Sequence, residues 1–234
     1  KSIDCIWNGM TLTDDIMANT ATTKAYAKNA QVVVVKDGTD YSSTADLVGK
    51  TVVAEAGSAG EAAIEGDENL AQADYVSKSV QTDCLMEVAA GTADAAVLDL
   101  TLANAMIGEG TSYPNLKHTD ELTTEEYGVG CRKGSDLASY INQVFADSYK
   151  DGSMEKIAET YGVQEALVEQ KDATFEQSEK DSDVDYIKGR GKLVVGVTDF
   201  EPMDYKDKDG NWIGFDADMA KLVGEKLGVE VDFV

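Results

Sequence analysis

The amino-acid sequence predicts an α/β protein. Short runs of β-branched residues, such as QVVVVK (31–36) and GKLVVGV (191–197), are too short for independent helices and are typical of buried strands. Between residues 33 and 120, such runs alternate with segments of helical periodicity. This alternation is the pattern of a parallel sheet covered by helices. The 21 glycines, against two prolines, indicate regular elements joined by glycine turns.

The predicted elements follow one another along the whole chain. A strand at 3–7 enters a polar turn, NGMTLTDD, and the segment 165–186 is charged, lacks apolar periodicity and is predicted to be a linker. The other predicted strands are 31–36, 51–57, about 74–78, 93–99, 128–133, 191–197 and 229–234. The predicted helices are TADLVGK capped by Thr44, one from about Ser58, one at 81–91, one at 100–110, two within 135–162 with the first capped by Ser135, and one after WIGF.

Composition bounds the class of protein. With 234 residues and 43% hydrophobic residues, the chain can bury one large or two modest cores, which excludes wholesale disorder. It contains no apolar run of the length that spans a bilayer, and no export signal opens it. The 44 acidic and 20 basic residues leave a formal charge of −24, which disfavours nucleic-acid and anionic-lipid partners. This charge could favour cationic ligands, but we interpret it as a solubility adaptation.

No metal or cofactor site is predicted. Cys5, Cys84 and Cys131 lie in apolar stretches without the close spacing of metal or redox motifs, so we expect small buried hydrophobes. The single histidine, His118, stands in a loop-like stretch without partners. No pairing of a nucleophile with a base can be read, so no catalytic residue is predicted.

Polar residues and glycines follow four predicted strands. Ligands of open α/β sheets bind beyond the carboxyl ends of the strands, where loops and helix N-termini converge. The candidate ligand residues are therefore Asp199, Phe200 and Glu201 after 191–197, Trp7, Asn8, Gly9, Met10 and Thr11 around the end of 3–7, Ser58, Ala59 and Gly60 after 51–56, and Asp99 after 93–98.

Each candidate has a structural alternative. The backbone amides from Ser58 to Gly60, at a helix start, suit a carboxylate, but Ser58 could be an ordinary N-cap. Asp99 could accept hydrogen bonds from an ammonium group, or cap the following helix. Gly9 allows close backbone approach, with the neighbouring Asn8 and Thr11 supplying polar contacts. Trp7 could border a ligand cleft or lie in the core.

Several segments resemble the amino-acid class of ABC-transporter solute-binding proteins. The segment GKLVVGVTDFEPMDYKDKDGNWIGFDADMAKLVGEKLGVEVDFV resembles the family's amino-terminal portion, and IDCIWNGMTLTDD resembles its next ligand loop. VVAEAGSAGEAAI resembles the anion-facing turn of the second lobe, ADAAVLDLTLANAM the strand ending in the acid that meets the ligand's amino group, and EEYGVGCRKGSDL the return crossing. The resemblance covers nearly the whole chain.

The resemblance implies the two-lobe type II periplasmic-binding-protein fold (Venus-flytrap) in circularly permuted order. The family's first segment stands last here, at 187–234, and about a dozen residues, one helix, are missing before Lys1. An engineered permutant or sensor fragment, a tandem gene cut at an unusual point, or an omitted stretch would explain this order. The implied domains are lobe 1 at 1–30 plus 125–234, with 165–186 joining the usual termini, lobe 2 at 33–120, and hinge crossings near 31–36 and 121–130.

The resemblance also assigns ligand roles. Phe200 would be the aromatic residue that stacks on the ligand, and its structural alternative is a simple core aromatic residue. The family commonly places an arginine beyond the TLT turn to bind the ligand's α-carboxylate, and this sequence has Ile16 there. Either backbone amides alone bind the carboxylate, or the ligand is an amine or a modified amino acid. Asp199, Glu201 and Asp99 would favour a cationic group.

The function implied is that of an extracytoplasmic receptor, periplasmic or a cell-surface lipoprotein, that captures a small polar amino-acid-like solute between two lobes. It would act as a monomer without cofactor and deliver the solute to an ABC permease. One alternative is an engineered ligand-binding or sensor module built from such a receptor. An enzyme on the same fold, like the cyclohexadienyl dehydratases, is disfavoured because no positioned acid–base machinery can be read.

Overall fold

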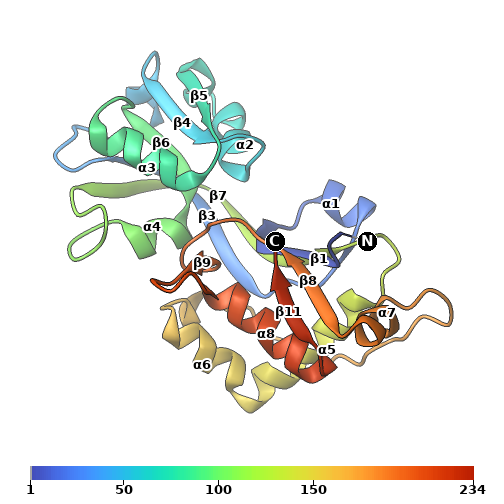
Figure 1. Ribbon diagram of the computed structural model, residues 1–234. Coiled ribbons are helices and arrows are strands. Elements are labelled where there is room, and N and C mark those ends of the chain that lie inside the picture. The colour runs from blue at the N-terminus through green and yellow to red at the C-terminus, as the bar shows by residue number, and fades with distance from the viewer. Residues whose placement is uncertain (1) are drawn as a thin grey trace. The chain divides into compact units, whose positions relative to one another are not determined.

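A computed structural model describes residues 2–234 and divides into two compact units. Unit 1 combines the chain up to Lys28 with Glu126–Val234, and unit 2 is Asn29–Glu125. Two long strands, β3 (Ala27–Lys36) and β7 (Leu116–Cys131), carry the chain from one unit to the other (Figure 1). Each unit has its own strands and helices, as the α/β prediction requires.

Unit 2 is built on the strand order β3-β6-β4-β5. The strands β4 (Thr51–Glu55), β5 (Asp74–Lys78) and β6 (Ala95–Asp99) are parallel, and β3 is antiparallel to β6. Their valine and alanine runs are buried because helices cover the sheet. These helices are α2 (Ala59–Gly66), α3 (Gln81–Ala90) and α4 (Leu100–Met106), with short 3-10 turns η1 (Thr44–Leu47) and η2 (Leu70–Gln72).

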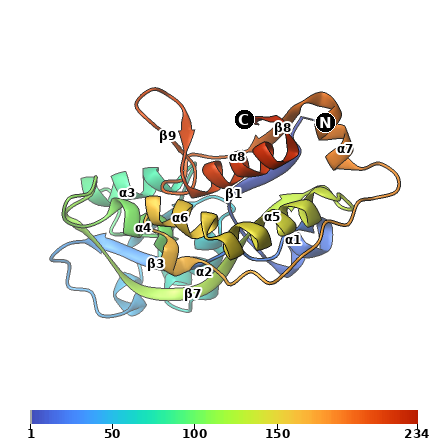
Figure 2. The same cartoon turned by 90° about the horizontal axis from the view of Figure 1, so that it is seen from below.

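Unit 1 is built on the strand order β11-β8-β1-β7. The strands β8 (Lys192–Gly196), β11 (Glu230–Phe233) and β1 (Cys5–Thr11) are parallel, and β7 is antiparallel to β1. Helix α8 (Phe215–Leu227) packs against β1, β8 and β11 (Figure 2). The remaining elements are α1 (Asp14–Asn19), β2 (Ala21–Thr22), α5 (Leu137–Asp151), α6 (Ser153–Thr160), η3 (Gln164–Ala166), α7 (Asp183–Arg190), and the hairpin of β9 (Tyr205–Lys206) and β10 (Trp212–Ile213).

The predicted turn after the first strand is wrong, because Asn8–Thr11 belong to β1. The register between β1 and β7 shifts between Ile6 and Met10, and Gly9 adopts φ +66° within this irregularity. Pairing then resumes at Met10 and Thr11. A glycine allows such a bulge because it has no Cβ to oppose a positive φ, and the polar residues after it can remain in a strand.

The starts of two helices and the linker also differ from the predictions. The segment predicted as a helix from Thr44 is only the 3-10 turn η1, whose cap is Ser43. Helix α5 has Asp136, not Ser135, as its N-cap. The Asp136 carboxylate accepts hydrogen bonds from Val184 N at 3.1 Å and Ser182 Oγ at 2.5 Å. These tertiary contacts place the start of α7 inside the segment predicted as a linker, whereas residues 168–182 form no helix or strand.

The three cysteines are free and buried, which confirms their predicted core role. Burial raises the pKa of each thiol, to about 12 for Cys84. Because the thiolate is the reactive form, we expect no thiol of the native protein to react with a disulfide reagent at pH 8 on the minute scale. Three thiols should react at once in guanidinium chloride. One fast thiol in the native protein would contradict the burial of that cysteine.

Candidate functional site

In unit 1, the loop after β8 places Phe200 against Gly9. The Phe200 N–H donates to Asp204 O at 2.6 Å, and the Asp204 N–H donates to Phe200 O at 2.8 Å, which closes the loop into a turn. The Phe200 ring meets Tyr127 edge-on at 6.2 Å between ring centroids. A Cβ on Gly9 would lie 2.4 Å from Phe200 Cε1. The ring therefore rests directly on the Gly9 backbone, and only 4% of Phe200 is exposed.

The polar candidates of unit 1 are more accessible than Phe200. Asn8, Met10 and Thr11 are half-buried, Asp199 is exposed and Glu201 is half-buried. The Asn8 amide donates to Thr198 Oγ1 at 3.3 Å and so joins β1 to the loop after β8. Burial, with a smaller contribution from the Asp199 charge, raises the pKa of Glu201 above its usual value. The structure thus brings the candidates after β8 and those of β1 together.

Trp7 lies in the core of unit 1. Its side chain has no exposed surface and packs against Tyr26 and Phe145, with ring centroids 6.4 and 5.7 Å away. This burial fits the alternative that Trp7 is a core residue and leaves it no surface for a ligand in this structure. Trp7 supports the site through packing, since it stands two residues before Gly9 in β1.

Ile16 occupies the middle of the short helix α1. The N-cap of this helix is Thr13, whose Oγ1 accepts a hydrogen bond from Ile16 N at 3.2 Å. The first turn carries Asp14 and Asp15, and its last turn carries no basic residue. Helix α1 therefore presents no guanidinium to a carboxylate, and its own charges are negative.

In unit 2, Ser58 is the N-cap of α2, and its Oγ accepts from Glu61 N at 3.2 Å. Ala59 and Gly60 form the first turn, whose N–H groups have no partner within a helix. Gly60 packs so closely that a Cβ would lie 2.7 Å from Val97 O of β6. The Glu61 carboxylate returns to accept from Gly57 N at 3.2 Å, so the helix start already holds one negative charge.

Asp99 ends β6 and is 6% exposed. Its Oδ1 accepts from Gln31 Nε2 at 2.5 Å, and its backbone N–H donates to Gln81 Oε1 at 3.0 Å. Gln31 Nε2 also donates to Glu125 Oε1 at 2.7 Å. Asp99 is thus a buried acceptor within a polar network at the end of its strand. Sequence reasoning missed Gln31 and Glu125, although a glutamine directly before VVVV in a buried strand was a usable signal.

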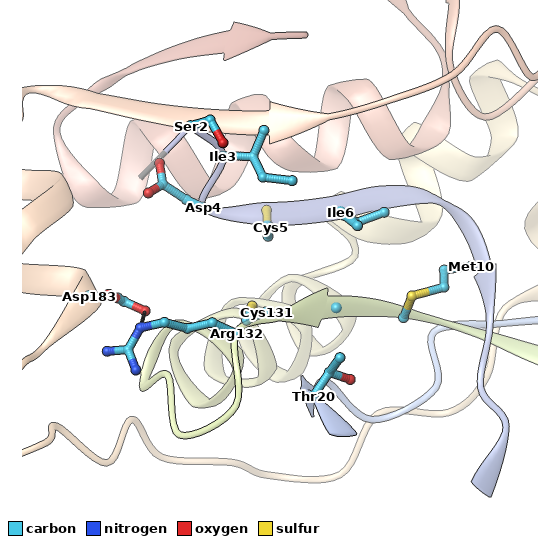
Figure 3. A pocket seen from close by; sticks show the side chains of 11 residues that line it. Ser2, Ile3, Asp4, Cys5, Ile6, Met10, Thr20, Cys131, Arg132 and Asp183 are labelled. Atoms are coloured by element: carbon cyan, nitrogen blue, oxygen red, sulfur yellow. Dashed lines mark ion pairs between the residues drawn. The ribbon is translucent and has the colours of Figure 1, made fainter. Parts of the chain in front are cut away.

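A separate apolar cavity of about 390 Å³ opens in unit 1 (Figure 3). Met10 is the one candidate ligand residue in its wall, and Arg132 Nε pairs with Asp183 Oδ2 at 2.9 Å at one end. Its lining residues are Ser2, Ile3, Asp4, Cys5, Ile6, Met10, Thr20, Gly130, Cys131, Arg132 and Asp183. This cavity is not lined by the loop after β8, so we assign it no part in the candidate site.

Two further properties concern metal ions and membranes. Within residues 2–234, the His, Cys, Asp and Glu side chains form no group of three or more that could hold a metal ion. Across the same residues, every helix is too short or too polar to cross a membrane.

Two α/β units connected by two long strands are the architecture of the type II periplasmic binding proteins. The chain belongs to the bacterial extracellular solute-binding proteins, family 3, which match residues 1–164 and 193–234. The predicted fold and family are thereby confirmed. The unmatched stretch contains the predicted linker.

Named relatives agree with this family. The chain is 32% identical over 173 residues to the probable amino-acid-binding protein YxeM of Bacillus subtilis, covering 72% of this chain and 65% of that protein. It is 30% identical over 171 residues to the histidine-binding periplasmic protein of Salmonella typhimurium, covering 69% of this chain and 65% of that protein. The chain therefore spans about two thirds, 65%, of the length of these curated relatives.

Solved structures show the same fold. The P235GK mutant of ArgBP from T. maritima superposes with a TM-score of 0.63 at 32% identity, over 69% of this chain and 70% of that chain. An ancestral arginine-binding protein bound to arginine gives a TM-score of 0.60 at 29% identity, over 68% of this chain and 71% of that chain.

Proposed function

We propose that this protein is an extracytoplasmic receptor that binds a small polar, amino-acid-like solute and delivers it to an ABC importer. The observation that carries the proposal is family membership, together with candidate ligand loops in both units. Unit 1 holds Phe200 against Gly9, and unit 2 presents the start of α2 and the end of β6. Hinge roles for 31–36 and 121–130, a permuted chain order, a monomeric state and a periplasmic or lipoprotein location belong to the same proposal.

The charges of the candidate residues favour a ligand with a cationic group. Asp199, Glu201 and Asp99 are acidic, and Glu61 already occupies the start of α2. Ile16 supplies no guanidinium for a carboxylate. We therefore propose a cationic amino acid or a related amine as ligand. Relatives described as histidine-binding and L-arginine-binding support this class.

We propose binding rather than catalysis. One similar structure, AncCDT-1, is described as an ancestral amino acid-binding protein and a precursor of cyclohexadienyl dehydratase. It is 27% identical with a TM-score of 0.59, over 67% of this chain and 68% of that chain. Its description as a binding protein agrees with the absence of a readable nucleophile–base pair among the candidate residues.

The test is a thermal-shift screen followed by calorimetry with L-arginine, L-histidine, L-lysine, agmatine and putrescine. A ligand that binds only the folded state stabilises it by about 2.7 kcal/mol at a hundredfold excess over its Kd. We expect at least one of these compounds to bind. Agmatine is arginine without its carboxylate, so equal affinity for the two would show that this site does not recognise the carboxylate. No binding of any amine or amino acid would overturn the proposal.

Asp99→Asn is the first variant to measure. It keeps the shape but removes the charge that would meet an ammonium group, and such a charge-assisted hydrogen bond contributes about 1.5–3 kcal/mol. We expect Kd to rise by roughly 10- to 100-fold. Asp40→Asn is the matched control, since Asp40 is an exposed acid of the same unit. Equal effects of the two variants would refute a direct role for Asp99.

A further inference from the structure

Asp216 lies in the first turn of α8 and is completely buried. Its Oδ2 accepts from Gly9 N at 2.8 Å, and its Oδ1 accepts from Tyr26 Oη at 2.7 Å. Both oxygens of this carboxyl group therefore receive donors, which is the environment that stabilises the ionised form. The contact to Gly9 joins α8 directly to a candidate ligand residue.

Asp204 is a second buried acid, and burial together with the nearby Asp216 raises its pKa well above the usual value. Within the described chain, neither of its carboxyl oxygens has a hydrogen-bond donor. An unpartnered anion in a dry interior beside another carboxylate is strongly unfavourable, so Asp204 is the member of the pair that keeps a proton. In that neutral form it can donate a hydrogen bond, and Asp216 is the neighbouring acid that, after burial, raises its pKa.

The backbone connects this pair to the ligand loop. Asp204 exchanges both backbone hydrogen bonds with Phe200, whose ring lies on Gly9, and Gly9 donates to Asp216. Printed contacts thus join the four residues in series, from Asp204 through Phe200 and Gly9 to Asp216 at the start of α8. A change at either carboxyl group would therefore move Phe200 relative to Gly9.

We propose that Asp204 and Asp216 are positioning residues that act as one buried carboxyl pair to hold Phe200 against Gly9 and so set ligand affinity. The inference rests on the proposed function, since it assigns Phe200 and Gly9 to the ligand. Neither acid contacts solvent, and neither would touch the ligand.

The pair should make affinity depend on pH. Burial raises the pKa of both acids, and the hydrogen bonds from Tyr26 and Gly9 limit the rise for Asp216 to about 7. Tyr26, the third titratable group of the cluster, has its pKa raised well above the ordinary value by burial and by Asp216, so it stays a donor. As pH falls through about 7, Asp216 takes up a proton and holds Gly9 less strongly, and affinity should fall.

The test measures the Kd of L-arginine by calorimetry from pH 5.5 to 8.5, together with the ¹H–¹⁵N resonance of the Gly9 amide without ligand. In the wild-type protein, both should change with a midpoint near pH 7. Asp204→Leu removes the donor to Asp216, so the midpoint should move up by about one pH unit, a tenfold change in proton affinity. Asp204→Asn restores a neutral donor and should return the midpoint to within a few tenths of a unit.

Two further variants complete the test. The side chain at position 216 cannot ionise in Asp216→Asn, so the pH midpoint should disappear. Only a titration of L-arginine itself would then remain in the Kd. Asp209→Asn, an exposed change of the same charge in the β9–β10 turn, should behave as the wild-type protein. The proposal is overturned if the pH midpoint is the same in Asp204→Leu and Asp216→Asn as in the wild-type protein. If one of these variants fails to fold, the other variant and the wild-type Gly9 resonance still provide the test.

The two readouts separate this proposal from the proposed function. Suppose that L-arginine and the other solutes fail to bind, but the pH midpoint of the Gly9 resonance changes in the Asp204 and Asp216 variants. The receptor function is then refuted, whereas the role of the carboxyl pair in holding Gly9 stands. If the pH midpoint of the Gly9 resonance changes in these variants but the Kd of L-arginine is constant with pH, positioning of the ligand is refuted and the receptor function stands. If the resonance is insensitive to all three changes at Asp204 and Asp216, the pair does not hold Gly9.

Discussion

Replacing Gly9 with alanine is expected to destabilise unit 1 by about 2–5 kcal/mol and to remove measurable ligand binding. Two costs add. The backbone of Gly9 has φ +66°, a conformation that L residues adopt at a cost of about 1–2 kcal/mol. The new Cβ would also lie 2.4 Å from Phe200 Cε1, and overpacking of this kind costs about 1–3 kcal/mol. Urea unfolding and calorimetry would measure the two effects.

The matched control is Gly38→Ala. Gly38 has φ +80°, but a Cβ added there would meet nothing within 4 Å, so only the backbone cost applies. We expect about 1–2 kcal/mol for Gly38→Ala and no change in ligand affinity. If the two variants lose equal stability, the Phe200 ring yields to the new methyl group. If Gly9→Ala keeps its ligand affinity, the stacked pair of Gly9 and Phe200 is not part of the binding site.

Trp7→Ala is expected to destabilise the protein by about 3–5 kcal/mol, the range for deleting a large aromatic side chain from a core. The indole is fully buried and packs against Tyr26 and Phe145. Tyr26 in turn donates to Asp216, so the loss of packing should also weaken binding through Gly9. Thermal and urea unfolding would measure the stability, with calorimetry for the ligand.

Trp7→Phe separates the two interpretations of Trp7. A phenylalanine keeps an aromatic ring in the cluster and leaves a smaller cavity, so stability should fall by less than in Trp7→Ala while ligand affinity stays within a few fold. A loss of affinity larger than tenfold in Trp7→Phe, at nearly unchanged stability, would mean that the indole meets the ligand directly. That result would contradict the core assignment.

Part of the candidate site could be predicted from local sequence. Ser58 before a run of small residues indicated a helix N-cap, and Asp99 at the end of AAVLD indicated an acid at a strand end. The structure placed both there. What local sequence did not indicate is that both already have partners: Asp99 Oδ1 accepts from Gln31, and the Glu61 carboxylate accepts from Gly57 at the start of α2. Gln31 belongs to another strand, β3, and Glu61 reaches Gly57 only because its side chain folds back over the helix start.

The sequence by itself determined the α/β class, the positions of most strands and the burial of the cysteines. These properties follow from runs and periodicities of neighbouring residues, which set which face of an element is apolar. The bulge at Gly9, the start of α7 and the buried pair of Asp204 and Asp216 were decided only by tertiary structure. Gly9 and Asp216 are 207 residues apart, and in the sequence Asp216 looks like any of the 44 acidic residues. Whether an acid is solvated or buried depends on which distant groups surround it, and only the folded chain brings those groups together.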